Sequence, residues 1–253
     1  MKKSIGLLVL LPFLTWAQDK KETPREGGHY DTNKFSQMYD LLATPNMFRT
    51  ASGAPGPAYY QQQADYKMDI VLDDKNKRLD GVETITYHNN SPEALEYLWI
   101  QLDQNEKSRD SKSPLVQSQR MDGAMPVDGF VKKYMEESFD GGFNLVYVLD
   151  AKGKPMKYTI NQTMMRTDLP QPLKPKEKVT FSIKWWYNIN NYRIDRGRSG
   201  YEESESDKNR LYVIAQFFPR MAVYNDVEGW QNMQFWGTGE FALVFGNYEV
   251  NIT

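Results

Sequence analysis

Cysteine is absent from this 253-residue chain, and histidine occurs only twice. Without cysteine there can be no disulfide, no thiolate chemistry, no Cys-ligated metal and no lipid-modified cysteine behind an export signal. His29 and His88 cannot form the histidine pair at i and i+4 of an HExxH zinc signature. We therefore interpret both as surface residues, and we expect packing alone to hold the fold together.

The sequence also lacks the marks of nucleophilic, phosphate-binding and nucleic-acid-binding chemistry. It has no GxSxG motif, and nothing marks a serine as a partner of His88. The Gly-containing run at 197–200 has no flanking strand and helix, so we interpret it as a loop rather than a nucleotide site. The formal net charge is −2, so the chain lacks the excess of positive charge that nucleic-acid-binding proteins carry. We expect no nucleic-acid partner and no catalytic residue in this chain.

Long apolar runs are limited to the first residues. Lys2 and Lys3 precede an apolar run at 5–16 that is too short to span a bilayer, and Ala17 provides a small residue before a cleavage point. This pattern predicts a signal peptide at 1–17, although a buried N-terminal helix is the alternative. We expect an exported protein, periplasmic or extracellular, with no membrane span in the mature chain.

The remaining chain is expected to contain a leader and one large domain. Residues 18–58 are predicted to be a leader and linker with a short amphipathic helix at 33–43. From residue 59 the apolar period changes to that of strands, and turn residues separate the runs. Strands are predicted at 66–72, 79–88, 95–102, 130–134, 143–149, 156–161, 179–187, 211–218 and 240–253. The fold expected for 59–253 is mainly β, a twisted antiparallel β-sandwich or saddle-like sheet with a short N-terminal helix.

Two local clusters leave alternatives open. Glu202, Glu203, Glu205 and Asp207 lie on a predicted loop at 195–209, where a solvated acidic surface or a cation site would fit. Paired acid–base catalysis needs burial to separate the pKa values of two carboxyl groups, which such a loop does not provide. 

The aromatic run at 185–187 is the second cluster. Trp185, Trp186 and Tyr187 are consecutive and must point to alternating faces of a strand. They form either core and interface contacts or an exposed platform on which a sugar could stack.

Three segments, in order, resemble a known family. Residues 66–105 combine a strand and turn, a Gly before the ETITYHN strand, a Ser-Pro turn and an apolar strand. The AQFFP run at 215–219 is followed by YND at 224–226 and by a strand pattern at 240–252. This order resembles the N-terminal domain of the aminopeptidase N family of zinc metallopeptidases, including that family's TQxEP…FPCxDEP stretch.

The resemblance implies a non-catalytic β-domain that forms one wall of a substrate cleft and docks on a catalytic domain. In that family the HExxH zinc site and the Gly-x-Met-Glu-Asn motif come later in the polypeptide. We therefore expect the chain to be truncated before its catalytic domain, since its last strand pattern runs into Thr253. No cofactor is expected in this chain; zinc is implied for the missing domain. The implied partners are that domain and a peptide substrate.

The resemblance also points to two substrate-binding residues. Gln216 matches the family's Gln, whereas Phe218 stands where the family has the Glu or Gln that holds the substrate's amino terminus. Ala215 replaces the leading Thr. A phenyl ring cannot pair with an ammonium group as a carboxylate does, but it offers a cation–π face. We expect a different mode of amino-terminal binding, or a protein that is not a typical aminopeptidase.

Two other functions remain open on the sequence. One is a stand-alone secreted β-sandwich that binds sugars or peptides through the aromatic run at 185–187. The other is a structural envelope protein. 

Overall fold

The computed structural model describes residues 45–116, 127, 139–193, 198–237 and 242–253. The chain divides into two compact units, Met1–Gly56 and Pro57–Thr253. The expected signal peptide, the helix at 33–43 and the strand at 130–134 lie outside the described residues. In the first unit, residues 45–56 form a tight loop in which Arg49 bridges Pro55 and the Asn46 carboxamide accepts two backbone N–H groups.

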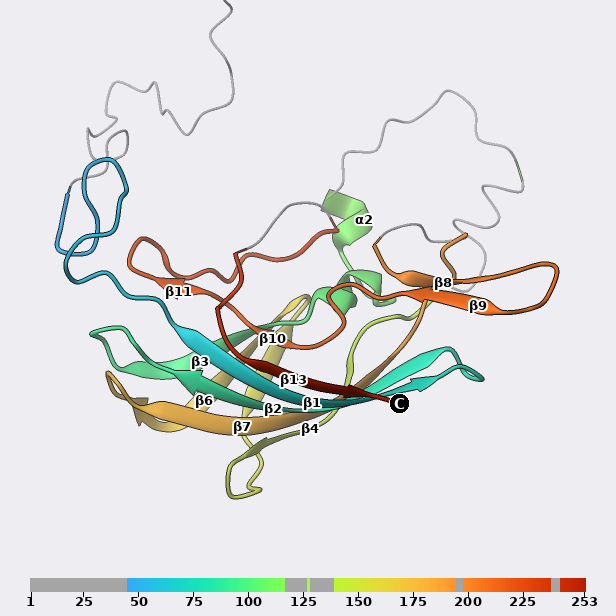
Figure 1. The fold of residues 1–253 in the computed structure, drawn as a ribbon, viewed down its shortest axis with the longest axis horizontal. Helices are drawn as coiled ribbons and strands as arrows, with labels where there is room; N and C mark the ends of the chain where they lie inside the picture. The colour runs from blue at the N-terminus through green and yellow to red at the C-terminus, as the bar shows by residue number, and fades with distance from the viewer. Residues whose placement is uncertain (1–44, 117–126, 128–138, 194–197, 238–241) are drawn as a thin grey trace, which may run out of the picture. The chain divides into compact units, whose positions relative to one another are not determined.

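In the second unit, five strands of the described residues form the larger sheet, in the order β13-β1-β2-β7-β4 (Figure 1). The strands are β1 (Gln63–Asp73), β2 (Arg78–His88), β4 (Asn144–Asp150), β7 (Lys178–Asn188) and β13 (Tyr248–Ile252). Neighbours pair antiparallel, except that β13 runs parallel to β1. This parallel pair is a departure from the antiparallel prediction.

The smaller sheet contains four strands among the described residues, in the order β10-β3-β6-β5. They are β3 (Leu95–Gln101), β5 (Tyr158–Asn161), β6 (Met164–Leu173) and β10 (Arg220–Met221). Strand β5 pairs with β6 only as far as Thr167. Pro170 and Pro172 therefore lie where one side of β6 has no β5 partner, as prolines in a strand require.

Shorter elements connect and flank the sheets. Strands β8 (Gly200–Glu203) and β9 (Arg210–Val213) form a hairpin, as do β11 (Tyr224–Asn225) and β12 (Gly229–Trp230). The 3-10 helix η1 (Asp103–Lys107) follows β3, and the single-turn helix α2 (Ser113–Val116) comes next. The fold is mainly β, which confirms the predicted class.

One hydrophobic core joins the two sheets. Alternation places every second residue of β1, β2 and β7 inward, where they meet inward residues of β3 and β6. The close fit explains Gly81: a Cβ there would lie 2.3 Å from the ring of Trp185. A Cβ at Gly246 would lie 1.6 Å from the Ala64 carbonyl oxygen, so glycine lets the chain approach β1 before β13 begins.

Several strand predictions were wrong in detail. The hairpin predicted through the turn at 150–153 extends only as far as Met156, where Leu149 bridges Pro155 and the Met156 N–H donates to the Val148 carbonyl at 2.9 Å. Beyond that point β5 joins the smaller sheet, whereas β4 belongs to the larger one. The strand predicted at 211–218 ends at Val213, since Gln216 has a positive φ of 54° that breaks the extended backbone. The loop predicted at 195–209 contains the strand β8.

Candidate functional site

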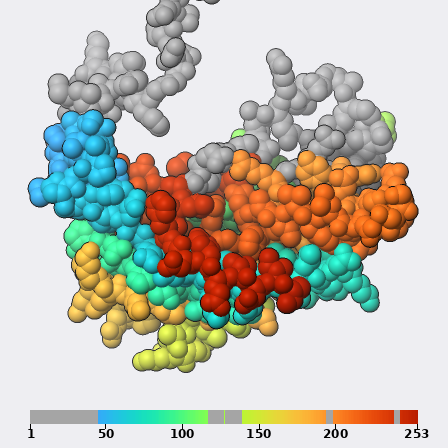
Figure 2. All heavy atoms as spheres, viewed as in Figure 1, coloured from blue at the N-terminus to red at the C-terminus, as the bar shows by residue number. Residues whose placement is uncertain are grey.

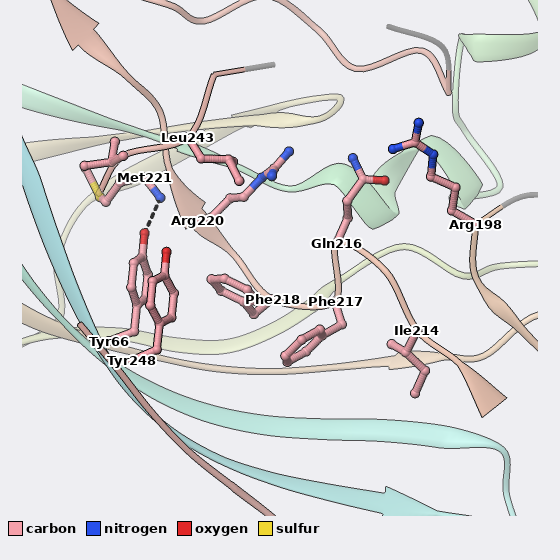
Figure 3. Close-up of a pocket in the computed structure, with 11 residues that line it drawn as sticks. Tyr66, Arg198, Ile214, Gln216, Phe217, Phe218, Arg220, Met221, Leu243 and Tyr248 are labelled. Carbon is pink, nitrogen blue, oxygen red and sulfur yellow. Dashed lines mark hydrogen bonds between the residues drawn. The ribbon is translucent and has the colours of Figure 1, made fainter. Parts of the chain in front are cut away.

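A cavity of about 370 Å³ lies between the segment after β9 and the start of β13 (Figure 3). Both predicted site residues, Gln216 and Phe218, line it. The full lining is Tyr66, Arg198, Ile214, Gln216, Phe217, Phe218, Arg220, Met221, Leu243, Val244 and Tyr248. The cavity therefore combines polar ends, aromatic rings and aliphatic side chains that come from separate parts of the sequence.

Two buried polar residues hold the segment that carries Gln216. The backbone N–H of Ala215 donates to the Ser199 hydroxyl oxygen at 3.0 Å, and the Ser199 hydroxyl donates to the Ala215 carbonyl at 2.9 Å. The Gln104 amide donates to the same carbonyl at 3.0 Å. Strand pairing ends at Val213, and beyond it these side-chain hydrogen bonds satisfy the backbone groups. Next to them Gln216 adopts a left-handed conformation, with a φ of 54°.

Aromatic rings form the floor of the cavity. The ring of Phe218 meets that of Tyr66 edge-on at 5.3 Å, and Tyr66 stacks on Tyr248 at 5.0 Å. The Met221 N–H donates to the Tyr66 hydroxyl at 2.9 Å, which fixes the strand β10 against β1. Burial raises the pKa of Tyr66 well above its usual value, so this phenol stays neutral. The floor is thus apolar and uncharged.

An ion pair between Arg220 and Asp103 lies behind the cavity, with side chains 11% and 3% exposed. Burial raises the pKa of Asp103, while the charge of Arg220 and hydrogen bonds from Arg220 and Gln216 oppose that rise. Asp103 lies at the start of η1, immediately after Leu102, and Arg220 begins β10. The ion pair thereby holds the Arg220 guanidinium group in place in the cavity lining.

The groups present define what the cavity can do chemically. Among the described residues, its lining contains two arginines and a carboxamide but no acidic residue, histidine or serine. Across the part of the chain that the structure describes, no group of His, Cys, Asp and Glu gathers at a spacing that could hold a metal ion. The cavity thus offers polar cationic and amide groups beside an apolar ring floor, an amphipathic lining.

The other candidate residues do not join this cavity. His88 makes a 3.1 Å contact with Asp65 on the opposite face of the larger sheet from the core. Two arginine side chains neutralise three residues of the acidic cluster: Arg193 pairs with Glu202 and Glu205, and Arg210 pairs with Glu203. Asp207 instead accepts from Asn209. The cation-site interpretation of these four carboxylates was wrong, because arginine and amide groups occupy them.

The aromatic run at 185–187 alternates between the core and the outer face of the sheet. Trp185 and Tyr187 are 0% and 2% exposed, and their rings meet Phe143 edge-on. Trp186 lies on the other face, half-buried, with the Arg78 guanidinium 5.2 Å from its ring. The core interpretation holds for Trp185 and Tyr187, so the three rings do not form one sugar-binding platform.

Sequence reasoning missed Arg198, Arg220, Leu243 and Tyr248 as cavity residues. Arg220 is two positions from Phe218 and could have been suspected because a charged residue there interrupts an apolar run. The other three carry no local signal, because only the parallel pairing of β13 with β1 brings Tyr248 beside Tyr66.

Comparison with known proteins returned structures but no sequence family. No family model matches the chain, and no curated protein matches it either. Similar solved structures include an M1 zinc metallopeptidase from Deinococcus radiodurans at 11% identity and a TM-score of 0.37, over 78% of this chain and 33% of that one. A mutant of the Deinococcus radiodurans enzyme bound to a Tyr-Ser-Ala substrate gives 11% identity and 0.35, over 79% and 34%.

A third structure, a two-domain M1 zinc metallopeptidase mutant bound to L-tryptophan, gives 12% identity and a TM-score of 0.36, over 79% of this chain and 34% of that one. The chain thus spans about a third of the length of these structures. TM-scores in this range do not establish a common fold. In the described residues, no helix is long and apolar enough to cross a membrane.

Proposed function

We propose that this chain is the non-catalytic N-terminal β-domain of an exported zinc metallopeptidase of the aminopeptidase N type. In this proposal the cavity lined by Gln216 and Phe218 forms one wall of the substrate cleft. A catalytic domain of the same polypeptide supplies the zinc and the reacting groups, and a peptide is the substrate.

One observation carries the proposal. Gln216, which matches the family's substrate-binding stretch, and Phe218, which stands at its Glu or Gln position, line a single cavity of about 370 Å³. A volume of this size accommodates one or two amino-acid side chains, within the range of small-ligand sites. Support also comes from the backbone, since Ser199 and Gln104 hold this irregular segment in place with partly buried hydrogen bonds. Pre-organised segments of this kind are typical of binding sites.

The exposed apolar surface near the cavity supports a docking role. Leu243, Phe245, Tyr248, Val250 and Ile252 are 40–68% exposed. They belong to the C-terminal segment, dark red on the visible face in Figure 2, and Leu243 and Tyr248 also line the cavity. An exposed apolar row of this kind marks an interaction surface. A catalytic domain that covers it would close the cavity into a cleft.

Phe218→Glu provides a test of the binding wall. In the polypeptide that joins this domain to a zinc-binding domain, we expect the substitution to raise kcat/KM about tenfold for peptides with a free amino terminus. The reason is that it adds a carboxylate to a lining whose described residues include none, and a charge-assisted hydrogen bond contributes about 1.5–3 kcal/mol. Turnover should be measured with paired free and N-acetylated peptides.

The matched control is Leu211→Glu, which adds a carboxylate on an exposed side chain of β9 that lies outside both the cavity lining and the apolar row. That variant should leave the preference for a free amino terminus unchanged. If Phe218→Glu also left it unchanged, residue 218 would not face the substrate's amino terminus and the proposed wall would be misplaced.

A further inference from the structure

The outer edge of strand β13 is a row of unpaired backbone groups. Both backbone groups of Thr253, the residue after β13, bond to β1 at 3.0 and 2.9 Å. Because the N–H and C=O groups of successive strand residues point to opposite sides, those of Tyr248, Val250 and Ile252 point away from β1. Among the described residues no strand pairs with β13 on that side. The edge therefore offers alternating donors and acceptors at the spacing of a β-strand.

Other sheet edges have features that discourage further pairing, whereas β13 does not. At the opposite side of the larger sheet, β4 has an irregular register between Leu145 and Tyr147. The smaller sheet ends in β10 and β5, which contain two and four residues. Strand β13 pairs with β1 over five residues without a register shift, and it contains no proline or lysine. A regular edge without such protection readily accepts another strand.

The two faces of β13 differ in polarity. Tyr248, Val250 and Ile252 share the core face with the β1 residues opposite them, yet they are 50%, 40% and 66% exposed. On the other face Glu249 and Asn251 are held by polar partners on β1. A strand added beside β13 would continue both faces. The edge thus fits a peptide in which apolar and polar residues alternate.

One end of this edge reaches the cavity. Tyr248 lines the cavity, its ring stacks on Tyr66 at 5.0 Å, and it meets the ring of Phe218 edge-on at 6.3 Å. Figure 3 shows the two tyrosine rings side by side, next to Phe218. A chain that lies along β13 would therefore bring the side chain opposite Tyr248 to the cavity. This continuity points to the peptide of the cavity as the partner of the edge.

We propose that the outer edge of β13 binds an extended peptide as an added antiparallel strand, with apolar side chains beside Tyr248, Val250 and Ile252. Antiparallel pairing is the more stable direction per residue. The inference rests on the proposed peptide-binding function and extends that site from the cavity along the strand. Main-chain hydrogen bonds contribute the affinity, and the alternating side chains contribute the specificity. The peptide pairs with the edge of β13 and leaves its apolar face to the docking catalytic domain.

N-methylated peptides test the inference on the 253-residue chain. The parent probe is acetyl-Lys-Val-Thr-Val-Thr-Val-Lys-amide, which alternates as the edge requires. In antiparallel addition the valines lie opposite the three apolar residues of β13 and exchange both hydrogen bonds with them. Methylating the three valine nitrogens should weaken binding by about tenfold or more, because those N–H groups face β13. Methylating the threonine nitrogens and the last lysine nitrogen is the matched control, with an expected change of about threefold or less, because those groups face away.

Backbone amide NMR and two variants locate the bound peptide. The parent probe should shift the amide resonances of Tyr248, Val250 and Ile252 and slow the exchange of these protons. Val250→Pro should weaken binding by about fivefold or more, since proline removes an outward N–H but no bond to β1. Val250→Ala keeps that N–H and should stay within about threefold of the unchanged chain. Circular dichroism verifies that both variants fold; if the proline variant does not, the two methylated peptides decide.

The two proposals fail in different ways. Equal losses for the two methylated peptides, or a larger loss for the threonine-methylated one, would overturn the inference as stated. Shifts confined to residues 214–221 would then leave peptide binding in the cavity intact. If the parent probe shifted no resonance at all, the peptide-binding function would be overturned together with the inference.

Sedimentation of the chain alone tests the rival occupant of the edge. We expect a monomer. A dimer that Val250→Pro dissociates would mean that a second copy of the chain, rather than a peptide, pairs with β13, and it would overturn the proposal.

Discussion

Replacing Trp185 by alanine should lower the free energy of unfolding by about 3–5 kcal/mol, the usual loss for a large aromatic side chain deleted from a core. The Trp185 side chain is 0% exposed and meets the Phe143 ring edge-on at 5.3 Å. Its ring also covers Gly81, whose missing side chain makes room for it. Urea unfolding followed by far-ultraviolet circular dichroism measures the loss.

The neighbouring tryptophan is the matched control. Trp186 lies on the outer face, where Arg78 covers its ring, so Trp186→Ala should lower the free energy of unfolding by about 1 kcal/mol or less. Equal losses for Trp185→Ala and Trp186→Ala would contradict the assignment of Trp185 to the core, and the aromatic run would again qualify as a ligand platform.

A double-mutant cycle sharpens the result. Gly81→Ala should be strongly destabilising in the unchanged chain, because its Cβ would lie 2.3 Å from the ring of Trp185. In the Trp185→Ala background the ring is gone, so the same change should be tolerated. A coupling near zero would mean that some contact other than the Trp185 ring excludes a side chain at position 81.

The free energy of unfolding should fall as pH rises because of Glu83, and Glu83→Gln should abolish that fall. Glu83 is 0% exposed on the inner face of β2, between Met68 of β1 and Ile183 of β7. Within the described residues neither carboxyl oxygen has a hydrogen-bond partner. Burial therefore raises the pKa of Glu83 well above its ordinary value of 4.5.

The sign follows from the two states of this group. Below pH 4.5 the carboxyl is protonated in both the folded and the unfolded chain, so its contribution to stability is fully present. Above that pH the unfolded chain ionises while the folded chain stays neutral, until the pH reaches the raised folded pKa. Stability in that window falls by about 1.4 kcal/mol per pH unit.

Urea unfolding at pH 5 and pH 8 measures this effect. Glu83→Gln should gain stability relative to the unchanged chain at pH 8 by far more than at pH 5, since glutamine stays neutral at both. Glu96→Gln, an exposed change on β3, should leave the pH dependence as it is. A pH dependence in Glu83→Gln as steep as in the unchanged chain would mean that the Glu83 carboxyl is ionised or solvated in the folded state.

The sequence predicted the sheet strands well because their signal is local. The period-two alternation at 66–72 and 179–187 and the turn residues after Asp73 reproduce β1, β2 and β7. The same local pattern failed at 214–218, where a run of apolar residues is not a strand but an irregular segment held by Ser199 and Gln104. Side-chain hydrogen bonds to backbone from distant residues leave no trace in apolar periodicity.

The site was only half predictable for a similar reason. Gln216 and Phe218 lie in a recognisable motif, but Arg198 and Tyr248 reach the cavity through the β8 segment and the parallel β13 strand. Pairing between strands about 180 residues apart depends on how the whole sheet assembles. The cationic residues of the lining therefore emerged only from the structure.

The central claim is that this chain binds peptides in the cavity around Gln216 and Phe218 without cleaving them. Photo-crosslinking tests it most directly, with Ala-Ala-Phe in which a benzoyl group is attached to the phenylalanine ring and mass spectrometry to map the adducts. We predict adducts within residues 214–221 or 243–248 and an intact probe after incubation. Adducts around Trp186 instead, or cleavage of the probe by the chain freed of other proteases, would contradict the account.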